Sequence, residues 1–217
     1  MDRSRPENAP VEPAPPRLTE RFLAALSLSG EVHGDQRRHG TQVPYAAHLL
    51  IVAGLVLEAG GDEDEAIAAV LHDSVEDGGG RPLLARIESD YGGRVAAIVA
   101  ACSDTLEPGS DDRSWKQRKQ AHLGHLAATR DDAVLRIMLA DKVHNARSIV
   151  RDFRSEGDAL WQRYSNRTPD DQLWYYDELV RLFDQRAEGP LVADLRRAVE
   201  ELRELLAAKP SGDSSGR

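Results

Sequence analysis

Apolar residues recur three and four positions apart along almost the whole chain, and no run of alternating β-branched residues interrupts this spacing. The spacing is typical of helices that each bury one face, so we predict an all-α fold, a single helical bundle. A length of 217 residues suits one domain with a proper core and is short for two. The predicted domain covers residues 18–208, and we expect the tails at 1–17 and 209–217, which are poor in packable side chains, to be disordered.

Start and stop signals divide this bundle into helices. Pro44 opens a helix that ends near the "EAGG" stretch. Asp62 and Glu65 form a capping pair for the next helix, which is predicted to end at the three glycines 78–80, and Pro82 restarts the chain. Further helices are predicted near residues 92–103, 113–129, 131–153, 158–164, 170–187 and 190–208.

Composition restricts the class of protein. Hydrophobic residues make up 41% and charged residues 30%, the usual mix of a cytoplasmic globular protein, and no apolar run is long enough for a membrane span or a signal peptide. A net charge of −9 repels phosphate backbones, which argues against a nucleic-acid coat protein. The single cysteine, Cys102, can form neither an internal disulfide nor a thiolate metal site, and its apolar neighbours predict a core position.

Two predicted helices place ionisable residues on an apolar face. His48 shares a face with Val52 and Leu55, so its imidazole points inward beside aliphatic side chains. Further along the chain, Asp141 follows Met138 on one face of the predicted helix 131–153, and the residues on this face change from apolar to polar along the helix. A carboxylate buried without a counter-charge would cost several kcal/mol or take up a proton. Both positions therefore call for a partner that the sequence alone does not supply.

A third such place is the stretch "LHDSVEDGGG", residues 71–80, which crowds His72, Asp73, Glu76 and Asp77 onto the end of a predicted helix. The C-terminal end of a helix carries partial negative charge, so acids there repel both that end and one another. Imidazoles and carboxylates from separate helices can surround one divalent ion, in a mixed nitrogen and oxygen shell suited to manganese, iron or zinc.

Each of these features also has a simpler explanation. His48 could be a hydrogen-bonded core histidine, Asp141 could pair with an arginine such as Arg147, and an acidic helix end is often only a solvated surface. The metal site is favoured because three places on helices that can pack together call for the same cation.

Three motifs in order, "HGDQRRHGTQVPYAAHLLIVAGLVLEAG", "AAVLHDSVEDGGG" and "LADKVHNAR", resemble the HD-domain superfamily, and within it the Rel/Spo-type alarmone hydrolases in their stand-alone small form. The resemblance covers about residues 18–185. It implies an all-α hydrolase that uses one manganese ion to remove the 3′-diphosphate from guanosine tetra- or pentaphosphate, releasing pyrophosphate. The chain has no "GxxxxGK[ST]" phosphate loop and ends too early for the synthetase half of long Rel proteins, so we expect hydrolysis without synthesis.

The resemblance also assigns roles at the centre of the site. It implies four metal ligands: His48, His72, Asp73 and Asp141. Glu76 and Asp77 match the acid pair that orients and deprotonates the attacking water. The residues that already required a cation are thus the ones that the resemblance makes ligands.

Substrate contacts are predicted from the same motifs and from two further clusters. Arg38 matches the arginine that stacks on the base, Asn145 matches the asparagine that contacts sugar and phosphate, and His39 stands where the family usually has lysine. The basic strip "RSWKQRKQ" ends near Lys119 and could hold the 5′-phosphates, although a solvated helix face would look the same. Tyr175 matches a pocket tyrosine of the family, although aromatics at this spacing are often core residues.

Other functions fit the same motifs. An HD-type enzyme acting on adenosine alarmones, pyrophosphorylated RNA ends or other nucleotides would use the same metal shell. A non-catalytic regulator, such as an antitoxin-like partner that binds an alarmone, should keep Arg38 but could lose the acids, so the presence of Glu76 and Asp77 favours an enzyme. The expected partner is a small nucleotide, and a homo-oligomer is compatible with the sequence.

Overall fold

The structure, a computed structural model, describes residues 17–103, 105–106, 113–164 and 168–208. In these residues it contains nine α-helices, a π-turn, a 3-10 segment and no strand, which confirms the all-α prediction. The elements in chain order are α1 (Glu20–His33), α2 (Ala46–Glu58), α3 (Glu63–Leu71), the π-turn Val75–Gly79, α4 (Gly80–Tyr91), α5 (Gly93–Cys102), α6 (Trp115–Ala128), α7 (Asp132–Glu156), the 3-10 segment Gly157–Arg163, α8 (Pro169–Arg186) and α9 (Pro190–Ala207). Apart from residue 17, the predicted tails at 1–17 and 209–217 lie outside the described residues.

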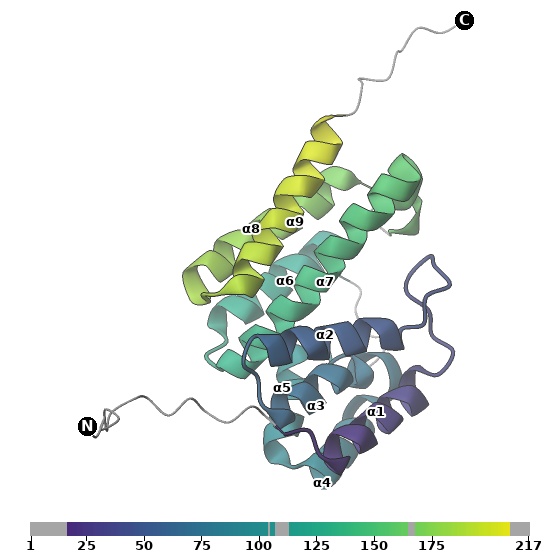
Figure 1. Cartoon of the computed structure of the whole chain (residues 1–217), viewed down its shortest axis with the longest axis vertical. Helices are drawn as coiled ribbons and strands as arrows, with labels where there is room; N and C mark the ends of the chain where they lie inside the picture. Colours follow the sequence, from purple (N-terminus) through teal and green to yellow (C-terminus); the bar gives the residue numbers. More distant parts are fainter. Residues whose placement is uncertain (1–16, 104, 107–112, 165–167, 209–217) are drawn as a thin grey trace, which may run out of the picture.

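The helices form two groups that are joined by α7 (Figure 1). Helices α1 to α5 lie at one end of the molecule, α8 and α9 lie at the other, and α7 runs from one group to the other. Its 25 residues span about 37 Å at 1.5 Å per residue, and it packs against α2, α3 and α5 as well as against α9. One helix therefore connects the two halves of the fold, and it carries Asp141 between them.

The core is centred on α3. Every side chain from Ala66 to Leu71 is fully buried, because α1, α2, α5 and α7 all pack against this helix. His72 directly follows Leu71, so the histidine emerges from the middle of the core rather than from its edge. Cys102 is buried as predicted, and burial raises the pKa of its thiol above the ordinary range.

The prediction of one helix from Asp62 to the glycines 78–80 is wrong in its second half. α3 ends at Leu71, and the chain then forms the π-turn before α4 begins at Gly80. The amide of Asp77 donates to the carbonyl of Asp73 at 2.9 Å, and Gly80 has a φ of 52°, which glycine adopts without strain. The four polar residues thus lie on an irregular turn, a geometry that recurs at functional sites.

A helix not identified from the sequence, α1, precedes Pro44 and begins at Glu20. The Thr19 hydroxyl caps it by accepting from the amide of Arg21. The helix predicted near 158–164 is a 3-10 segment. The remaining boundaries lie within three residues of their predicted positions.

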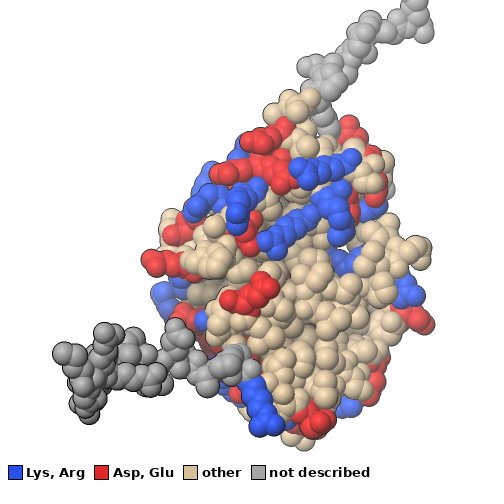
Figure 2. Space-filling view, in the orientation of Figure 1, with Lys and Arg blue, Asp and Glu red and all other residues tan. Residues whose placement is uncertain are grey.

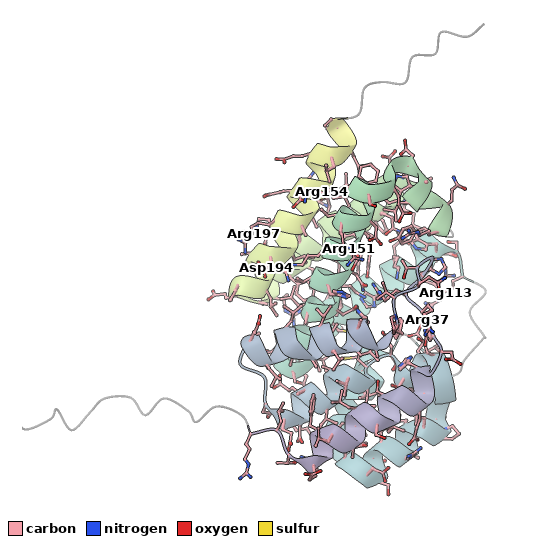
Figure 3. All side chains as sticks on the ribbon, turned by 45° about the vertical axis from the view of Figure 1, so that its right-hand side comes forward. Arg37, Arg113, Arg151, Arg154, Asp194 and Arg197 are labelled. Carbon is pink, nitrogen blue, oxygen red and sulfur yellow. The ribbon has the colours of Figure 1, made fainter. Side chains whose placement is uncertain are left out.

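Charges on the surface are mixed rather than segregated over α7 and α9. Figure 2 shows Lys and Arg beside Asp and Glu on this face, and Figure 3 shows Arg197 beside Asp194. Arg197 pairs with Asp194, and Arg154 pairs with Glu201 at 2.7 Å. In the described part of the chain, no helix has both the length and the hydropathy needed to cross a bilayer. The cytoplasmic location and the absence of nucleic-acid binding stay predictions.

Candidate functional site

An inner cavity of about 180 Å³ lies where α2, α7 and the end of α3 meet. The polar residues predicted from the sequence as metal ligands all line it, together with Glu76. The remaining lining residues are Tyr45, Cys102, Lys119, His122, Met138, Lys142 and Asn145. Residues of α2, α5, α6, α7 and the turn after α3 thus line one small polar space.

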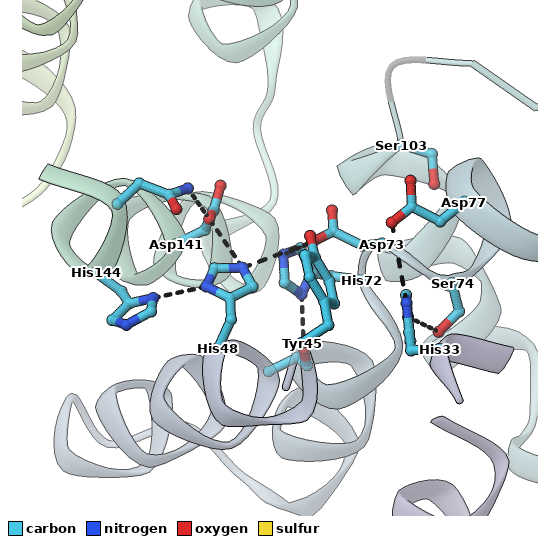
Figure 4. Close-up of polar contacts among 12 residues, drawn as sticks. His33, Tyr45, His48, His72, Asp73, Ser74, Asp77, Ser103, Asp141 and His144 are labelled. Atoms are coloured by element: carbon cyan, nitrogen blue, oxygen red, sulfur yellow. Dashed lines mark hydrogen bonds and ion pairs between the residues drawn. The ribbon is translucent and has the colours of Figure 1, made fainter. Parts of the chain in front are cut away.

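Three of the four predicted ligands lie close enough to share one ion, and the fourth, Asp141, contacts one of these three (Figure 4). One ligand atom from each of His48, His72 and Asp73 lies within 4.8 Å of the others. His48 Nε2 is 3.6 Å from Asp73 Oδ2 and 3.3 Å from Asp141 Oδ1. The structure therefore brings together all four side chains that the sequence singled out.

The hydrogen bonds of His72 test whether a cation fits. His72 Nδ1 lies 2.8 Å from the carbonyl oxygen of Ala69, so Nδ1 carries the proton in the neutral ring and Nε2 carries a lone pair. Nε2 is buried without a hydrogen bond and lies 3.0 Å from Asp73 Oδ2. A lone pair and a carboxylate oxygen at this distance repel unless a proton or a metal ion lies between them. The nitrogen and oxygen donors fit a divalent transition metal.

Charge in the cavity supports the same conclusion. Burial would raise the pKa of Asp73, but the imidazoles of His72 and His48 hold this pKa well below its ordinary value. Burial would also raise the pKa of Asp141, which Lys142 and His48 lower instead. Both carboxylates are therefore ionised at neutral pH. Burial would lower the pKa of His72, yet the two carboxylates raise it to about 9. Without a metal ion this ring therefore holds a proton at neutral pH, and a bound cation would take the place of that proton.

The two acids of the π-turn occupy different surroundings. Glu76 lines the inner cavity, whereas Asp77 does not. Asp77 Oδ2 accepts from Gln36 Nε2 at 2.9 Å and lies 3.9 Å from His33 Nδ1. The geometry thus separates the predicted acid pair into one carboxylate beside the predicted metal ligands and one that holds the loop before α2.

An outer pocket of about 320 Å³ adjoins the inner cavity. All five predicted substrate contacts line it: Arg38, His39, Lys119, Asn145 and Tyr175. The other lining residues are Thr41, Tyr45, Trp115, Lys142, Ser148, Ile149, Arg151, Asp152, Tyr164, Gln172 and Tyr176. The volume and the mixture of aromatic and cationic side chains suit a small anionic ligand with a ring.

A short loop holds Arg38 at this pocket. The amide of Arg38 donates to the carbonyl of Val43 at 2.8 Å. Gly40 has a φ of 69°, and a Cβ there would lie 2.4 Å from Cδ of Arg163, so this loop requires glycine. The guanidinium of Arg38 lies 5.8 Å from the ring centroid of Tyr45 and donates to Asn145 Oδ1 at 2.6 Å. The guanidinium is thereby anchored at the edge of the pocket.

The pocket lining also contains aromatic and cationic side chains. Lys119 Nζ lies 5.0 Å from the ring centroid of Tyr175, and Trp115 packs edge-on against the same ring at 6.1 Å. His39 hydrogen-bonds the carbonyl of Arg163. Lys119 lines both cavities, so it is the member of the basic strip that is placed to contact a ligand in either space.

The model of the HD-domain family matches residues 25–169. The chain belongs to the HD-domain family. A Synechocystis sp. protein named probable guanosine-3′,5′-bis(diphosphate) 3′-pyrophosphohydrolase is 32% identical over 125 residues, which are 58% of this chain and 16% of that protein. A Mycobacterium leprae protein named probable GTP pyrophosphokinase is 33% identical over 127 residues, 58% of this chain and 15% of that protein.

The match therefore spans about a sixth of the length of these curated relatives. A solved structure of a metazoan ortholog of SpoT that hydrolyses ppGpp shares the fold, with a TM-score of 0.70 at 24% identity over 87% of this chain and 98% of that one. The resemblance to the HD-domain superfamily and its Rel/Spo-type members is confirmed.

This HD domain contains site residues that the sequence analysis missed. Lys142 lines both cavities, its side chain is 12% exposed, and its Nζ lies 2.6 Å from Asp141 Oδ2. Burial would lower the pKa of Lys142, but the attraction of Asp141 raises it well above its ordinary value. His122, which is also buried, lines the inner cavity. The polar stripe of α7 indicated Asp141 but not the direction of the neighbouring lysine.

A third missed residue, His144, supports the predicted ligand His48 of the HD domain. The two Nδ1 atoms lie 2.6 Å apart. Burial, together with the charges of His48 and Arg38, lowers the pKa of His144 to about 3, so this ring is neutral. If His48 binds a metal through Nε2, its Nδ1–H donates to His144, which fixes the orientation of the ligand ring.

Proposed function

We propose that this HD domain is a manganese-dependent hydrolase that removes the 3′-diphosphate from guanosine tetra- or pentaphosphate. The observation that carries the proposal is the junction of the cavity that contains the four predicted metal ligands with a pocket lined by Arg38 and aromatic side chains. A diphosphate fits the first space and a nucleoside fits the second. The name of the Synechocystis relative supports the same reaction.

In the proposed reaction, the oxygen of a water molecule bonds to the phosphorus nearest the ribose, and the bond between that phosphorus and the ribose 3′ oxygen breaks. The electron pair of this bond goes to the 3′ oxygen, which becomes a hydroxyl group. The products are pyrophosphate and guanosine 5′-di- or triphosphate.

Different residues of the chain have different roles in this reaction. His48, His72, Asp73 and Asp141 would hold the ion, which when bound lowers the pKa of water and polarises a phosphoryl oxygen. The Glu76 carboxylate lines the same cavity and takes the proton of the attacking water. Asn145 keeps the ligand carboxylate of Asp141 in place through its amide nitrogen.

Arg38 is assigned to the base. Its planar guanidinium can cover a purine face, a contact worth about 0.5 to 2 kcal/mol. Lys119 and Tyr175 line the same pocket. With the base beside Arg38, the 3′-diphosphate would reach the inner cavity through the residues that line both spaces.

A substrate panel tests the proposed function. Pyrophosphate release is measured with manganese on guanosine 3′,5′-bis(diphosphate), its adenosine analogue, a pyrophosphorylated RNA end and GTP. We expect pyrophosphate from the guanosine substrate, with kcat/KM above that of the adenosine analogue by about tenfold or more. Absence of pyrophosphate from both 3′-diphosphates would refute the assignment.

Removal of the metal should destabilise the fold. A ligand that binds only the native state stabilises it by about 2.7 kcal/mol at a hundredfold excess over Kd. For a domain of this size each kcal/mol shifts Tm by roughly 2 to 4 °C, so EDTA should lower Tm by about 5 to 11 °C. Thermal melts with and without EDTA, and with manganese restored, measure this shift. An unchanged Tm together with no bindable ion would argue against the metal site.

Arg38→Ala should weaken substrate binding more than it affects the metal. Loss of a stacking contact of the size given above raises KM by about 2- to 30-fold. Arg37→Ala is the matched control, since the Arg37 side chain bonds the Asp35 carbonyl at 3.0 Å and does not line the outer pocket. Steady-state kinetics and metal analysis of both variants measure the change in KM and in metal content. Equal KM values for Arg38→Ala and the parent protein would remove Arg38 from the site.

A further inference from the structure

Four residues line both the inner cavity and the outer pocket: Tyr45, Lys119, Lys142 and Asn145. In the proposed function, on which this inference rests, the diphosphate lies in the first space and the nucleoside in the second. The bond that breaks joins these two parts of the substrate. In the bound substrate, the ribose 3′ oxygen must therefore lie near these four side chains.

This oxygen is a poor leaving group, because it departs with the negative charge of an alkoxide. Donors aimed at developing charge are a large contribution to catalysis. Two of the four residues already have their polar atoms in hydrogen bonds with other side chains. The Tyr45 hydroxyl donates to Asp73 Oδ2 at 2.6 Å. The Asn145 side chain donates to Asp141 and accepts from Arg38.

Lys142 has donors left for this oxygen. An ammonium group carries three N–H donors, and Asp141 Oδ2, at 2.6 Å, accepts one of them. The side chain is largely buried, where a fixed charge acts more strongly than it does in water. The other cation at the junction, Lys119, has its Nζ over the Tyr175 ring.

We propose that the Lys142 ammonium hydrogen-bonds the ribose 3′ oxygen and stabilises the negative charge that develops there as its bond to phosphorus breaks. The ammonium keeps its proton throughout, and the 3′ oxygen takes its proton from solvent. Asp141 orients the ammonium toward the junction of the two cavities. Lys142 is thus a catalytic residue in addition to being the counter-charge of Asp141.

A change of leaving group tests this role. Rates are measured on guanosine 3′,5′-bis(diphosphate) and on its analogue with sulfur in place of the bridging 3′ oxygen, because a thiolate leaves without such help. The variants are Lys142→Met, Lys142→Gln, Lys142→Arg and Lys119→Met. Arg203→Met, on the exposed face of α9 with a side chain 49% exposed, is the control. Metal content and Tm are recorded for each variant.

We expect Lys142→Met and Lys142→Gln to lose about a hundred- to a thousandfold on the oxygen substrate and less than about tenfold on the sulfur analogue. Lys142→Arg should recover most of the oxygen rate, and all Lys142 variants should keep the metal. The two rates are compared within one preparation, so incomplete folding of a variant cancels.

Three results would overturn the assignment: equal losses on both substrates, no loss on either, or the leaving-group dependence in Lys119→Met instead. Hydrolysis of neither substrate by the parent protein is a different failure, since it refutes the proposed function and the inference falls with it.

Discussion

Asp73→Asn is expected to abolish metal binding and hydrolysis together. Asp73 Oδ2 lies 3.0 Å from His72 Nε2 and 3.6 Å from His48 Nε2, so its charge is at the centre of the cluster. An amide retains the shape but removes the charge, and losing the ion forfeits several kcal/mol of transition-state stabilisation, a rate loss of about a thousandfold or more. Metal analysis of the purified variant and its rate of pyrophosphate release measure both effects.

Asp90→Asn is the matched control, because this carboxylate lies on the surface of α4 with its side chain 45% exposed. It should keep one ion per chain and the parent rate. If Asp73→Asn also keeps both, the cluster does not hold the catalytic metal.

Glu76→Gln should separate metal binding from proton transfer. The amide keeps the size of the side chain and cannot accept a proton, and loss of a general base typically reduces the rate about a hundred- to ten-thousandfold. The metal content and Tm should stay close to those of the parent protein. Rate and metal content are measured on the same preparation.

Asp77→Asn gives the sharper comparison with Glu76→Gln. The motif implies that both acids act on the water, whereas the structure places Asp77 beside Gln36 and outside the inner cavity. We expect the loss in Asp77→Asn to be the smaller of the two. A parent-like rate in Glu76→Gln with metal bound would show that the carboxylate in the cavity does not take the proton.

The convergence of the four proposed metal ligands on one cavity could be anticipated from the sequence, because burial conflicts with charge or polarity at these positions. His48 and Asp141 occupy apolar helix faces, and periodicity alone reveals that conflict. The all-α fold follows from the same periodicity. α1 was missed because it mixes serines and a glycine with its apolar residues, so its buried face gives a weak signal.

The break after Leu71 could not be predicted in the same way. Periodicity counts residues per turn, and a five-residue π-turn changes that count without a proline or an isolated glycine to mark it. The contact of His144 with His48 could not be predicted from the sequence either. His144 and His48 are 96 positions apart, and only the packing of α7 against α2 brings their rings together.

The central claim is that one divalent ion, held by His48, His72, Asp73 and Asp141, serves the hydrolysis of a guanosine 3′-diphosphate. Titrating the metal-free protein with manganese, while measuring both bound ion and pyrophosphate released from guanosine tetraphosphate, tests it most directly. The rate should rise in proportion to bound manganese, stop rising at one ion per chain, and yield one pyrophosphate for each GDP. A full rate without bound ion, or one bound ion without pyrophosphate release, would contradict the account.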